Sequence, residues 1–175
     1  MTTMKQVFFC FLFIPVIFAN CGNRDPDKIE VRTASFEDYN ITIPKDWNYI
    51  HKPDSAAFVS KDNRYSLTIN VNPYDKNKSS EELSKLFQKF LDIRLEAEKT
   101  ATNNDIELTP VKINKANHHI YSRFNGYEIT PKRFFECLMT AEKGKLVTVY
   151  IESFTDDQEY FLNLSGKIIN SLEIK

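Results

Sequence analysis

The chain has 175 residues with 23 basic and 24 acidic side chains, so its formal net charge is −1 at pH 7. A chain of this length forms one ordinary domain with a sizeable core, and a charge this close to zero argues against nucleic acid as a partner. Only four glycines occur, which argues against a glycine-rich phosphate-binding loop and against a fold built from many tight turns.

The N-terminal residues have the pattern of an export signal. Lys5 supplies a positive charge, and residues 7–19 form an apolar run that only Pro15 interrupts. A run of this length is too short to cross a bilayer, which takes about 20 residues. The residues that follow, 22–29, form a short polar linker without a stop-transfer pattern. We therefore expect residues 1–20 to be a signal peptide that is removed on export.

Residues 18–21, Phe-Ala-Asn-Cys, resemble the lipobox at which bacterial lipoproteins are cut and acylated. Ala19 suits this pattern, although the residue after it departs from the usual small side chain. The resemblance implies that Cys21 is lipidated, that residues 21–29 form a lipidated linker, and that the bacterial membrane is a partner through this anchor. The domain, residues 30–175, would then lie in the cell envelope, facing the periplasm or the cell surface.

Cysteine usage leaves a second interpretation of Cys21 open. Cys10 lies in the leader, so a lipidated Cys21 leaves Cys137 without a partner for an intramolecular disulfide. If the leader is cut near Ala19 without lipidation, Cys21 is a free thiol or pairs with Cys137. Cys137 lies in the largely apolar run 134–139, which favours a buried cysteine that packs as a small apolar side chain over a reactive thiol.

Two short strands open the domain. Apolar and polar side chains alternate over residues 29–33 and again over 39–43, the period of a strand with one face buried. Pro44 ends the second strand because it lacks the amide that a sheet ladder needs. Trp47 follows, and we expect it either to cover the core or to form a contact platform for a ligand or partner.

A hairpin and a long helix come next. The hairpin has arms at residues 56–60 and 64–72, and the second arm alternates most regularly in the chain. The helix is predicted over residues 79–99, because Ser79 and Glu82 have the spacing of a capping box. Apolar side chains recur at helical spacing and predict the face that packs on the core: Leu83, Leu86, Phe87, Phe90, Leu91, Ile93 and Ala97.

The C-terminal half is predicted to hold four more strands, over residues 106–113, 118–129, 133–141 and 146–154. Pro110 suggests an edge position or a bulge in the first of them, and Gly126 a bulge or bend in the second. Residues 142–145 suit a tight hairpin turn, since they include a glycine. The last strand is apolar on both faces, which predicts a central position with cover on both sides.

A second helix closes the chain. Thr155 and Gln158 form a candidate capping box, and Asp156 and Asp157 suit the positive end of a helix dipole. The predicted buried face consists of residues at helical spacing: Phe161, Leu164, Ile168 and Leu172.

Residues 39–47, Tyr-Asn-Ile-Thr-Ile-Pro-Lys-Asp-Trp, resemble the opening of PsbP-like and DcrB-like domains. The order of the later elements and the closing segment 169–172, Ile-Asn-Ser-Leu, are similar to the same domains, so the resemblance covers residues 36–174. It implies the α+β class, namely an α/β/α sandwich with an antiparallel sheet of about six or seven strands and a helix on each face. It also implies a non-enzymatic role, with no catalytic residues and no cofactor to carry over.

Motifs for catalysis or metal binding are absent from the sequence. It contains no nucleophile elbow, phosphate loop or dinucleotide fingerprint. His118 and His119 would point to opposite faces of a strand, and His51 lies far away in sequence, so we expect no metal site. The two neighbouring histidines are expected on the surface or in contact with a partner. Glu136 is expected on the solvent side of an edge strand, with burial as the alternative.

These patterns favour a membrane-tethered envelope lipoprotein that acts as a non-catalytic protein-binding module, with Trp47, His118 and His119 as candidate partner contacts. A narrower form is an immunity protein that neutralises a toxin delivered to the periplasm. The rival hypothesis is a carrier of a small apolar ligand, held in a pocket between sheet and helix by five aromatic residues: Tyr65, Phe87, Phe90, Phe135 and Tyr150. A filled core in that space would exclude the carrier. We do not expect an enzyme, which would need a cleft of converging polar groups.

Overall fold

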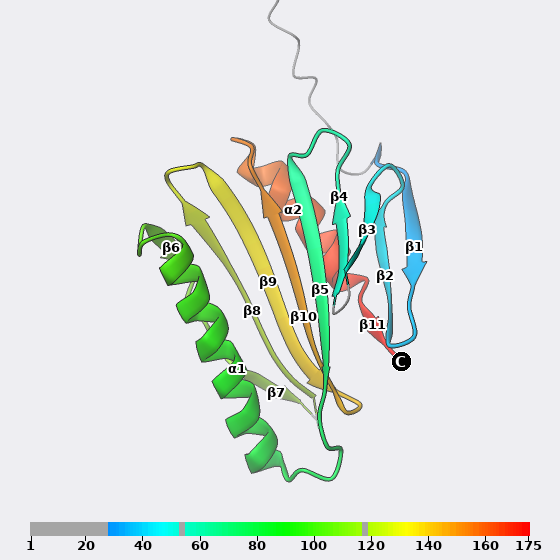
Figure 1. The fold of residues 1–175 in the computed structure, drawn as a ribbon, viewed down its shortest axis with the longest axis vertical. Coiled ribbons are helices and arrows are strands. Elements are labelled where there is room, and N and C mark those ends of the chain that lie inside the picture. Colours follow the sequence, from blue (N-terminus) through cyan, green and yellow to red (C-terminus); the bar gives the residue numbers. More distant parts are fainter. Residues whose placement is uncertain (1–27, 53–54, 117–118) are drawn as a thin grey trace, which may run out of the picture.

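The computed structural model describes residues 28–175 apart from residues 53–54 and 117–118. In this part of the chain an antiparallel sheet of eight strands has a helix on each face (Figure 1). Its strands lie side by side in the order β3 (Asn48–Lys52), β4 (Ser55–Val59), β5 (Tyr65–Pro73), β10 (Lys145–Ser153), β9 (Arg133–Glu142), β8 (His119–Glu128) and β6 (Ile106–Leu108), while β7 (Asn114–Ala116) also pairs with β8. The helices are α1 (Ser80–Ala101) and α2 (Gln158–Asn170). The predicted α+β class and the helix on each face are confirmed.

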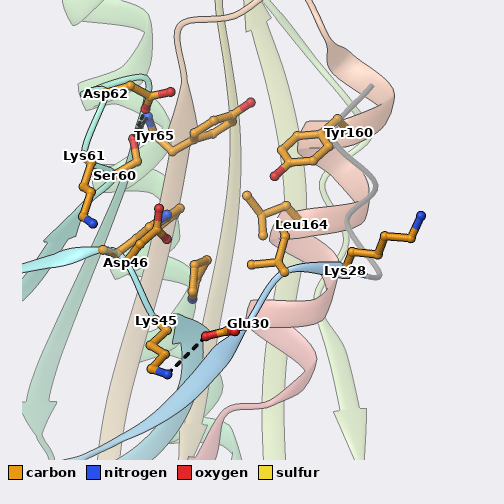
Figure 2. Close-up of a pocket in the computed structure, with 13 residues that line it drawn as sticks. Lys28, Glu30, Lys45, Asp46, Ser60, Lys61, Asp62, Tyr65, Tyr160 and Leu164 are labelled. Atoms are coloured by element: carbon orange, nitrogen blue, oxygen red, sulfur yellow. Dashed lines mark hydrogen bonds and ion pairs between the residues drawn. The ribbon is translucent and has the colours of Figure 1, made fainter. Parts of the chain in front are cut away.

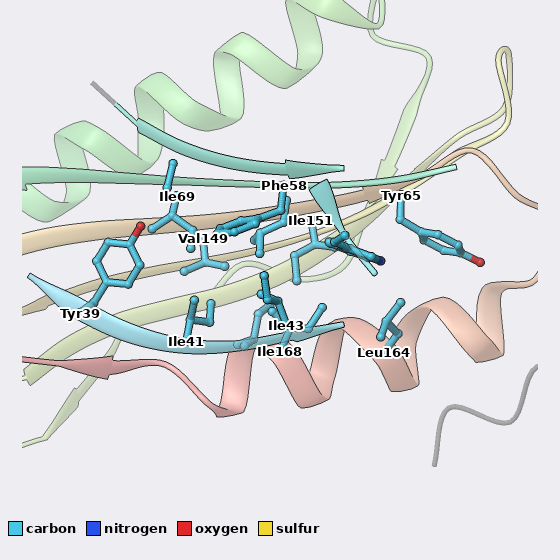
Figure 3. Packing of buried hydrophobic residues seen from close by; sticks show 14 of the residues in the cluster. Tyr39, Ile41, Ile43, Phe58, Tyr65, Ile69, Val149, Ile151, Leu164 and Ile168 are labelled. Atoms are coloured by element: carbon cyan, nitrogen blue, oxygen red, sulfur yellow. The ribbon is translucent and has the colours of Figure 1, made fainter. Parts of the chain in front are cut away.

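The two N-terminal strands form a separate small sheet. The predicted strands are present as β1 (Val31–Ser35) and β2 (Tyr39–Pro44). They pair with each other, and β2 also pairs with β11 (Glu173–Ile174), so that they do not extend the large sheet. This small sheet lies beside α2 over one face of the large sheet. Its packing there buries alternate residues of β2 in the same core cluster as residues of α2 and β10. Figure 3 shows Ile41, Ile43 and Ile168 opposite Val149 and Ile151.

Helix α1 covers the other face of the large sheet. Leu83, Phe87 and Leu91 are buried and belong to one core cluster with Phe135 and Tyr150. The capping box is confirmed at its start. The Glu82 amide donates to Ser79 Oγ at 3.2 Å, and the Ser79 amide donates to Glu82 Oε2 at 2.8 Å. The Ser79 amide and the Ser79 hydroxyl both donate to Glu82 Oε2, and these two hydrogen bonds hold the pKa of Glu82 below its usual value.

The prediction of the buried face of α1 is wrong for its last two residues, Ile93 and Ala97. Ile93 is 58% exposed and Ala97 is also exposed. The positions that continue the 83–87–91 spacing toward the sheet are those of Arg94 and Glu98, and Glu98 is buried. Charged side chains therefore occupy the last turns of the buried face, and this apolar pattern does not extend along the whole helix.

Strand β10 occupies the centre of the large sheet, as predicted. It lies between β5 and β9. Leu146 and Tyr150 face α1, whereas Val147, Val149 and Ile151 belong to the core cluster under α2. The β9–β10 turn is also confirmed, with positive φ of 52° at Lys143 and 81° at Gly144, as a two-residue hairpin turn of this hand requires.

Local geometry excludes one of the two alternatives at Gly126, the bulge, and corrects the predicted cap of the second helix. Gly126 makes no bulge, because the pairing of β8 with β9 runs through it without interruption. A Cβ there would lie 2.5 Å from the ring of Phe135 and 2.8 Å from Leu108 Cδ2, so this glycine allows close packing of its neighbours. Helix α2 is capped by Asp157 and not by Thr155, since the Asp157 side chain accepts from the Tyr160 amide at 3.0 Å.

The edges of the large sheet were the least predictable part. Strand β3 was not predicted, and all of its residues are exposed, so no buried alternation marks it. The predicted strand over 106–113 is much shorter, because pairing of β6 ends at Leu108. Pro110 lies just beyond that point, at the edge of the sheet, which is where a residue without an amide donor is tolerated.

Candidate functional site

The domain has two ends with different character. We call the end at which β1 begins the linker end. Strands β2 and β4 end there, and α2 begins there (Figure 1). The opposite end, with the start of α1 and the β9–β10 turn, is the hairpin end.

A groove of about 880 Å³ opens at the linker end. Its walls are the chain before β1, the turns that follow β2 and β4, and the first two turns of α2 (Figure 2). The residues that line this linker-end groove are Lys28, Ile29, Glu30, Pro44, Lys45, Asp46, Trp47, Ser60, Lys61, Asp62, Tyr65, Tyr160 and Leu164.

Aromatic rings form the floor of the linker-end groove. The ring of Trp47 stacks on that of Tyr65 with 6.3 Å between centroids, and Tyr65 lies 5.9 Å from Tyr160 on α2. Trp47 is only 4% exposed and belongs to the core, so the interpretation that it covers the core is confirmed. Its backbone carbonyl accepts from Arg32 Nη2 at 2.9 Å. Partner contact through the remaining edge of Trp47 stays a prediction.

The β4–β5 turn places the second wall of the groove. Ser60 Oγ accepts from the amides of Arg64 and Tyr65 at 3.1 and 3.0 Å and donates to Asp62 Oδ1 at 2.7 Å. Asn63 has a φ of 56°, a conformation that asparagine tolerates better than most residues. One serine side chain thus organises the predicted turn and keeps Lys61 at the rim.

Charges on the rim of the groove are balanced. Three basic residues, Lys28, Lys45 and Lys61, stand with three acidic ones, Glu30, Asp46 and Asp62. Lys45 Nζ lies 3.1 Å from Glu30 Oε2, but both side chains are more than half exposed, so this pair adds little to stability. The rim offers both signs of charge around an aromatic floor.

A buried ion network lies at the linker end on the α1 face of the sheet. Arg133 is the centre of this network, and its guanidinium contacts Glu98 at 3.1 Å, Glu128 at 2.8 Å and Glu152 at 3.3 Å. It also donates to the Tyr150 hydroxyl at 3.2 Å, and its side chain is 13% exposed. We call this set the Arg133 network.

Neighbouring groups complete the Arg133 network. Arg94 pairs with Glu98 and lies 4.0 Å over the Tyr150 ring. Burial opposes the charge on Arg133, but the field of Tyr150, Glu98 and the nearby Glu128 outweighs it and raises the pKa of Arg133. Burial, followed by the charge of Glu98, raises the pKa of Tyr150 far above its usual range. The carboxylates are thus paired within the fold, which makes the network structural.

Glu136 is buried, so its expected position on the solvent side of an edge strand is wrong. It is 4% exposed and lies on β9 in the interior of the sheet. Arg123 Nε donates to Glu136 Oε1 at 2.6 Å, and the Ser165 hydroxyl of α2 donates to its other oxygen. The carboxylate therefore links α2 to the sheet.

Cys137 is fully buried in the α1 cluster, as predicted. Burial raises the pKa of its thiol to about 12, so a reactive thiolate is not favoured at neutral pH. Cys21 itself, with the predicted signal peptide and most of the lipidated linker, lies outside the described residues.

Of the two histidines predicted as partner contacts, the structure describes only His119. His118 lies outside the described residues. His119 is half-buried at the hairpin end, with Nε2 2.6 Å from Thr140 Oγ1, so it and Trp47 lie at opposite ends of the domain. His51 lies on β3 beside Tyr49. Within residues 28–175, leaving aside the two short gaps, no group of three or more metal-ligating side chains is assembled.

The five aromatic residues proposed for a small apolar ligand do not line one pocket. Tyr65 belongs to the core under α2, whereas Phe87, Phe135 and Tyr150 belong to the core under α1. Phe87 and Phe135 are both fully buried in this second core. The carrier hypothesis in that form is wrong, because the sheet separates Tyr65 from the residues beneath α1.

No family model and no curated protein matches the sequence. Solved structures do share the fold. Cyanobacterial PsbP (CyanoP) from Synechocystis sp. PCC 6803 is 14% identical with a TM-score of 0.64, over 90% of this chain and 99% of that one. The Saccharomyces cerevisiae Ran-binding protein Mog1p is 5% identical with a TM-score of 0.56, over 83% and 96%. LpqN, involved in cell envelope biogenesis of Mycobacterium tuberculosis, is 8% identical with a TM-score of 0.48, over 85% and 92%.

The chain thus has the α+β sandwich fold of PsbP and Mog1p. This confirms the PsbP-like fold that residues 39–47 predict. At these identities the likeness concerns the fold alone. In the described part of the chain, neither helix is long and apolar enough to cross a membrane.

Proposed function

We propose that this chain is a membrane-tethered envelope lipoprotein whose domain binds a protein partner without catalysing a reaction. The proposal rests on two features that lie next to each other in the chain. The leader and the Cys21 pattern predict a lipid anchor, in which each buried methylene adds about 0.8 kcal/mol to membrane binding. The linker-end groove lies where the chain enters the domain.

The position of the linker-end groove is the observation that carries the proposal. The seven residue steps from Cys21 to Lys28 span at most about 25 Å when fully extended. An anchored domain would therefore hold this groove close to the bilayer surface. A partner in or near the same membrane would meet the linker end before any other part of the domain.

The lining of the groove indicates what kind of partner segment would fit. Apolar ligands favour sites lined mainly by hydrophobic groups, but this groove has six charged residues around its aromatic floor. A protein segment that inserts one aromatic or aliphatic side chain and presents charges of both signs matches it better than a lipid-like ligand. Aromatic anchors of this kind dominate the binding energy of many protein interfaces.

Site-specific photo-cross-linking in native membranes tests the proposal. A photoreactive amino acid replaces Lys61 on the groove rim, and a matched control replaces Lys89, an exposed lysine on α1. We expect a discrete protein adduct from position 61 alone. The adduct should weaken when the rim charges are exchanged by Lys45→Glu with Asp46→Lys. Equal adducts from both positions, or an adduct that the exchange does not change, would contradict the proposal.

The anchor is tested separately by fractionation and mass. We expect the wild-type chain in the membrane fraction and the Cys21→Ala chain outside it, with an intact mass of the mature wild type that includes acyl groups on Cys21. A wild-type chain recovered as soluble protein would overturn the proposed membrane anchor. It would not overturn partner binding at the linker-end groove, which the cross-linking experiment tests.

A further inference from the structure

A second pocket, of about 630 Å³, lies at the hairpin end. It is enclosed by the loop between β5 and α1, the first turns of α1, the β7–β8 pair and the β9–β10 turn. We call it the lysine pocket, and its lining residues are Tyr74, Lys76, Lys78, Ser80, Glu81, Leu83, Ser84, Lys115, His119, Ile120, Lys143 and Gly144.

The charge of the lysine pocket is strongly positive. Four lysines line it against a single carboxylate, that of Glu81, and Glu81 already lies 2.7 Å from the ammonium of Lys85. The whole chain has a formal charge of −1, so the excess is local. Clefts lined by one sign of charge attract ions of the opposite sign and concentrate them.

The lysines converge from segments that are far apart in the sequence. Lys76 follows β5, Lys115 lies on β7, and Lys143 lies in the β9–β10 turn. The aliphatic part of Lys76 crosses Gly144, where an added Cβ would lie 2.6 Å from Lys76 Cγ. The Tyr74 amide donates to the Gly144 carbonyl at 2.8 Å and ties this loop to the turn. The fold therefore positions Lys76 over the pocket.

The ammonium groups retain capacity for a ligand. Neither Lys76 nor Lys115 forms an ion pair with any carboxylate in the described part of the chain. Lys143 is partly engaged, because its Nζ donates to the Ile174 carbonyl at 2.6 Å and lies 4.0 Å from Glu142 Oε1. The capacity for a ligand therefore lies mainly with Lys76 and Lys115. The amide end of α1 is not what supplies the site, because Ser79 and Glu82 already cap it.

We propose that the lysine pocket binds a phosphorylated ligand with at least two negative charges. Lys76, Lys78 and Lys115 contact the phosphate oxygens, since ammonium groups bind phosphate by charge-assisted hydrogen bonds. The apolar floor of Tyr74, Leu83 and Ile120 accepts the organic part of the ligand. This site lies at the end opposite to the linker-end groove and does not depend on the function proposed for that groove.

Pyrophosphate is the probe that tests this site. The full mature chain, in nanodiscs of neutral phosphatidylcholine, is titrated with pyrophosphate at constant ionic strength while amide signals are followed by NMR. We expect saturable shifts at Gly144, His119 and Lys76. The Lys76→Gln/Lys115→Gln chain should bind at least about tenfold more weakly. The matched control Lys89→Gln/Lys99→Gln removes the same charge from the exposed side of α1 and should bind as wild type does.

A second arm distinguishes the source of the phosphate. Nanodiscs that contain phosphatidic acid, whose phosphomonoester headgroup can carry two negative charges, replace the neutral ones, without pyrophosphate. If the same lysine-dependent shifts appear here, the phosphate belongs to a lipid headgroup; if they appear only with pyrophosphate, it belongs to a soluble molecule. No saturable shift in either arm, or equal shifts in the Lys76→Gln/Lys115→Gln chain, would overturn the proposal.

Discussion

The linker end and the hairpin end of the domain differ in how their charges are balanced. At the linker end, Arg133 lies among three carboxylates inside the fold, and the exposed rim of the groove carries equal numbers of basic and acidic residues. At the hairpin end, four lysines share one surface pocket with one carboxylate. Paired buried charges determine how elements dock on each other. A surface cluster of like charge weakens the compact state, and therefore indicates a role outside folding.

Removing Arg133 should have the largest effect on stability. Arg133→Met leaves Glu98, Glu128 and Glu152 without their central cation, and breaking such a buried arrangement costs about 3–5 kcal/mol of the free energy of unfolding. Urea unfolding measures the loss. Arg64→Met is the control, because Arg64 is exposed at the same end and its change should stay within about 0.5 kcal/mol. Similar small losses in both variants would mean that the Arg133 network is not structural.

Alkaline pH should lower the free energy of unfolding through two groups in the core under α1, Cys137 and Tyr150. The pKa of Cys137 is raised from 9.0 to about 12, and that of Tyr150 is raised above 10.0. The folded state therefore keeps these protons at pH values where the unfolded chain has lost them, so stability is complete below pH 9 and falls as pH rises above it. Each group contributes a slope of up to about 1.4 kcal/mol per pH unit. A Cys137→Val/Tyr150→Phe chain should show a shallower fall between pH 9 and 11 in urea unfolding, and an unchanged slope would contradict this.

Substituting Gly144 should affect both stability and the lysine pocket. Gly144→Ala places a Cβ at a φ of +81° and against Lys76, which should cost about 1 kcal/mol. The displaced Lys76 should also weaken pyrophosphate binding. Gly166→Ala is a suitable control, since its nearest contact would be 3.5 Å away. Normal pyrophosphate binding by Gly144→Ala would show that the turn does not position Lys76.

The smallest change in stability should come from the lysines themselves. Lys76→Gln/Lys115→Gln should change the free energy of unfolding by less than about 0.5 kcal/mol, because neither side chain has an ion-pair partner in the described structure. Urea unfolding at low and high salt measures this. A loss above about 1 kcal/mol would mean that these lysines stabilise the fold, as the Arg133 network does, and would remove the reason to propose a ligand at the hairpin end.

Local patterns in the sequence predicted much of the fold. The capping box of Ser79 and Glu82, the β9–β10 turn at Gly144 and the central position of β10 all depend on residues close in sequence, and the structure confirms them. Of the two roles left open for Trp47, the structure confirms the core cover; Trp47 lies three residues after the strand-ending Pro44. These features arise from capping, turn geometry and side-chain periodicity, which act over a few residues.

The candidate sites could not be predicted in the same way. The Arg133 network joins residues from α1, β8, β9 and β10, and charged side chains in an otherwise apolar helix face give no local sign that they are buried. The lysine pocket joins Lys76, Lys115 and Lys143, which only the pairing of strands and the docking of α1 bring together.

The sequence by itself determined the two helices and most of the longer strands of this domain, because helix caps, turns and alternating burial are local properties. The resemblance carried by residues 39–47 implied the α+β class. Only the tertiary structure decided that β1 and β2 form a second sheet, that Glu136 is buried, and that the two ends of the domain differ in charge. The physical reason is that burial and electrostatic pairing depend on partners distant in sequence. Their positions follow only from how the helices and the small sheet pack on the large one.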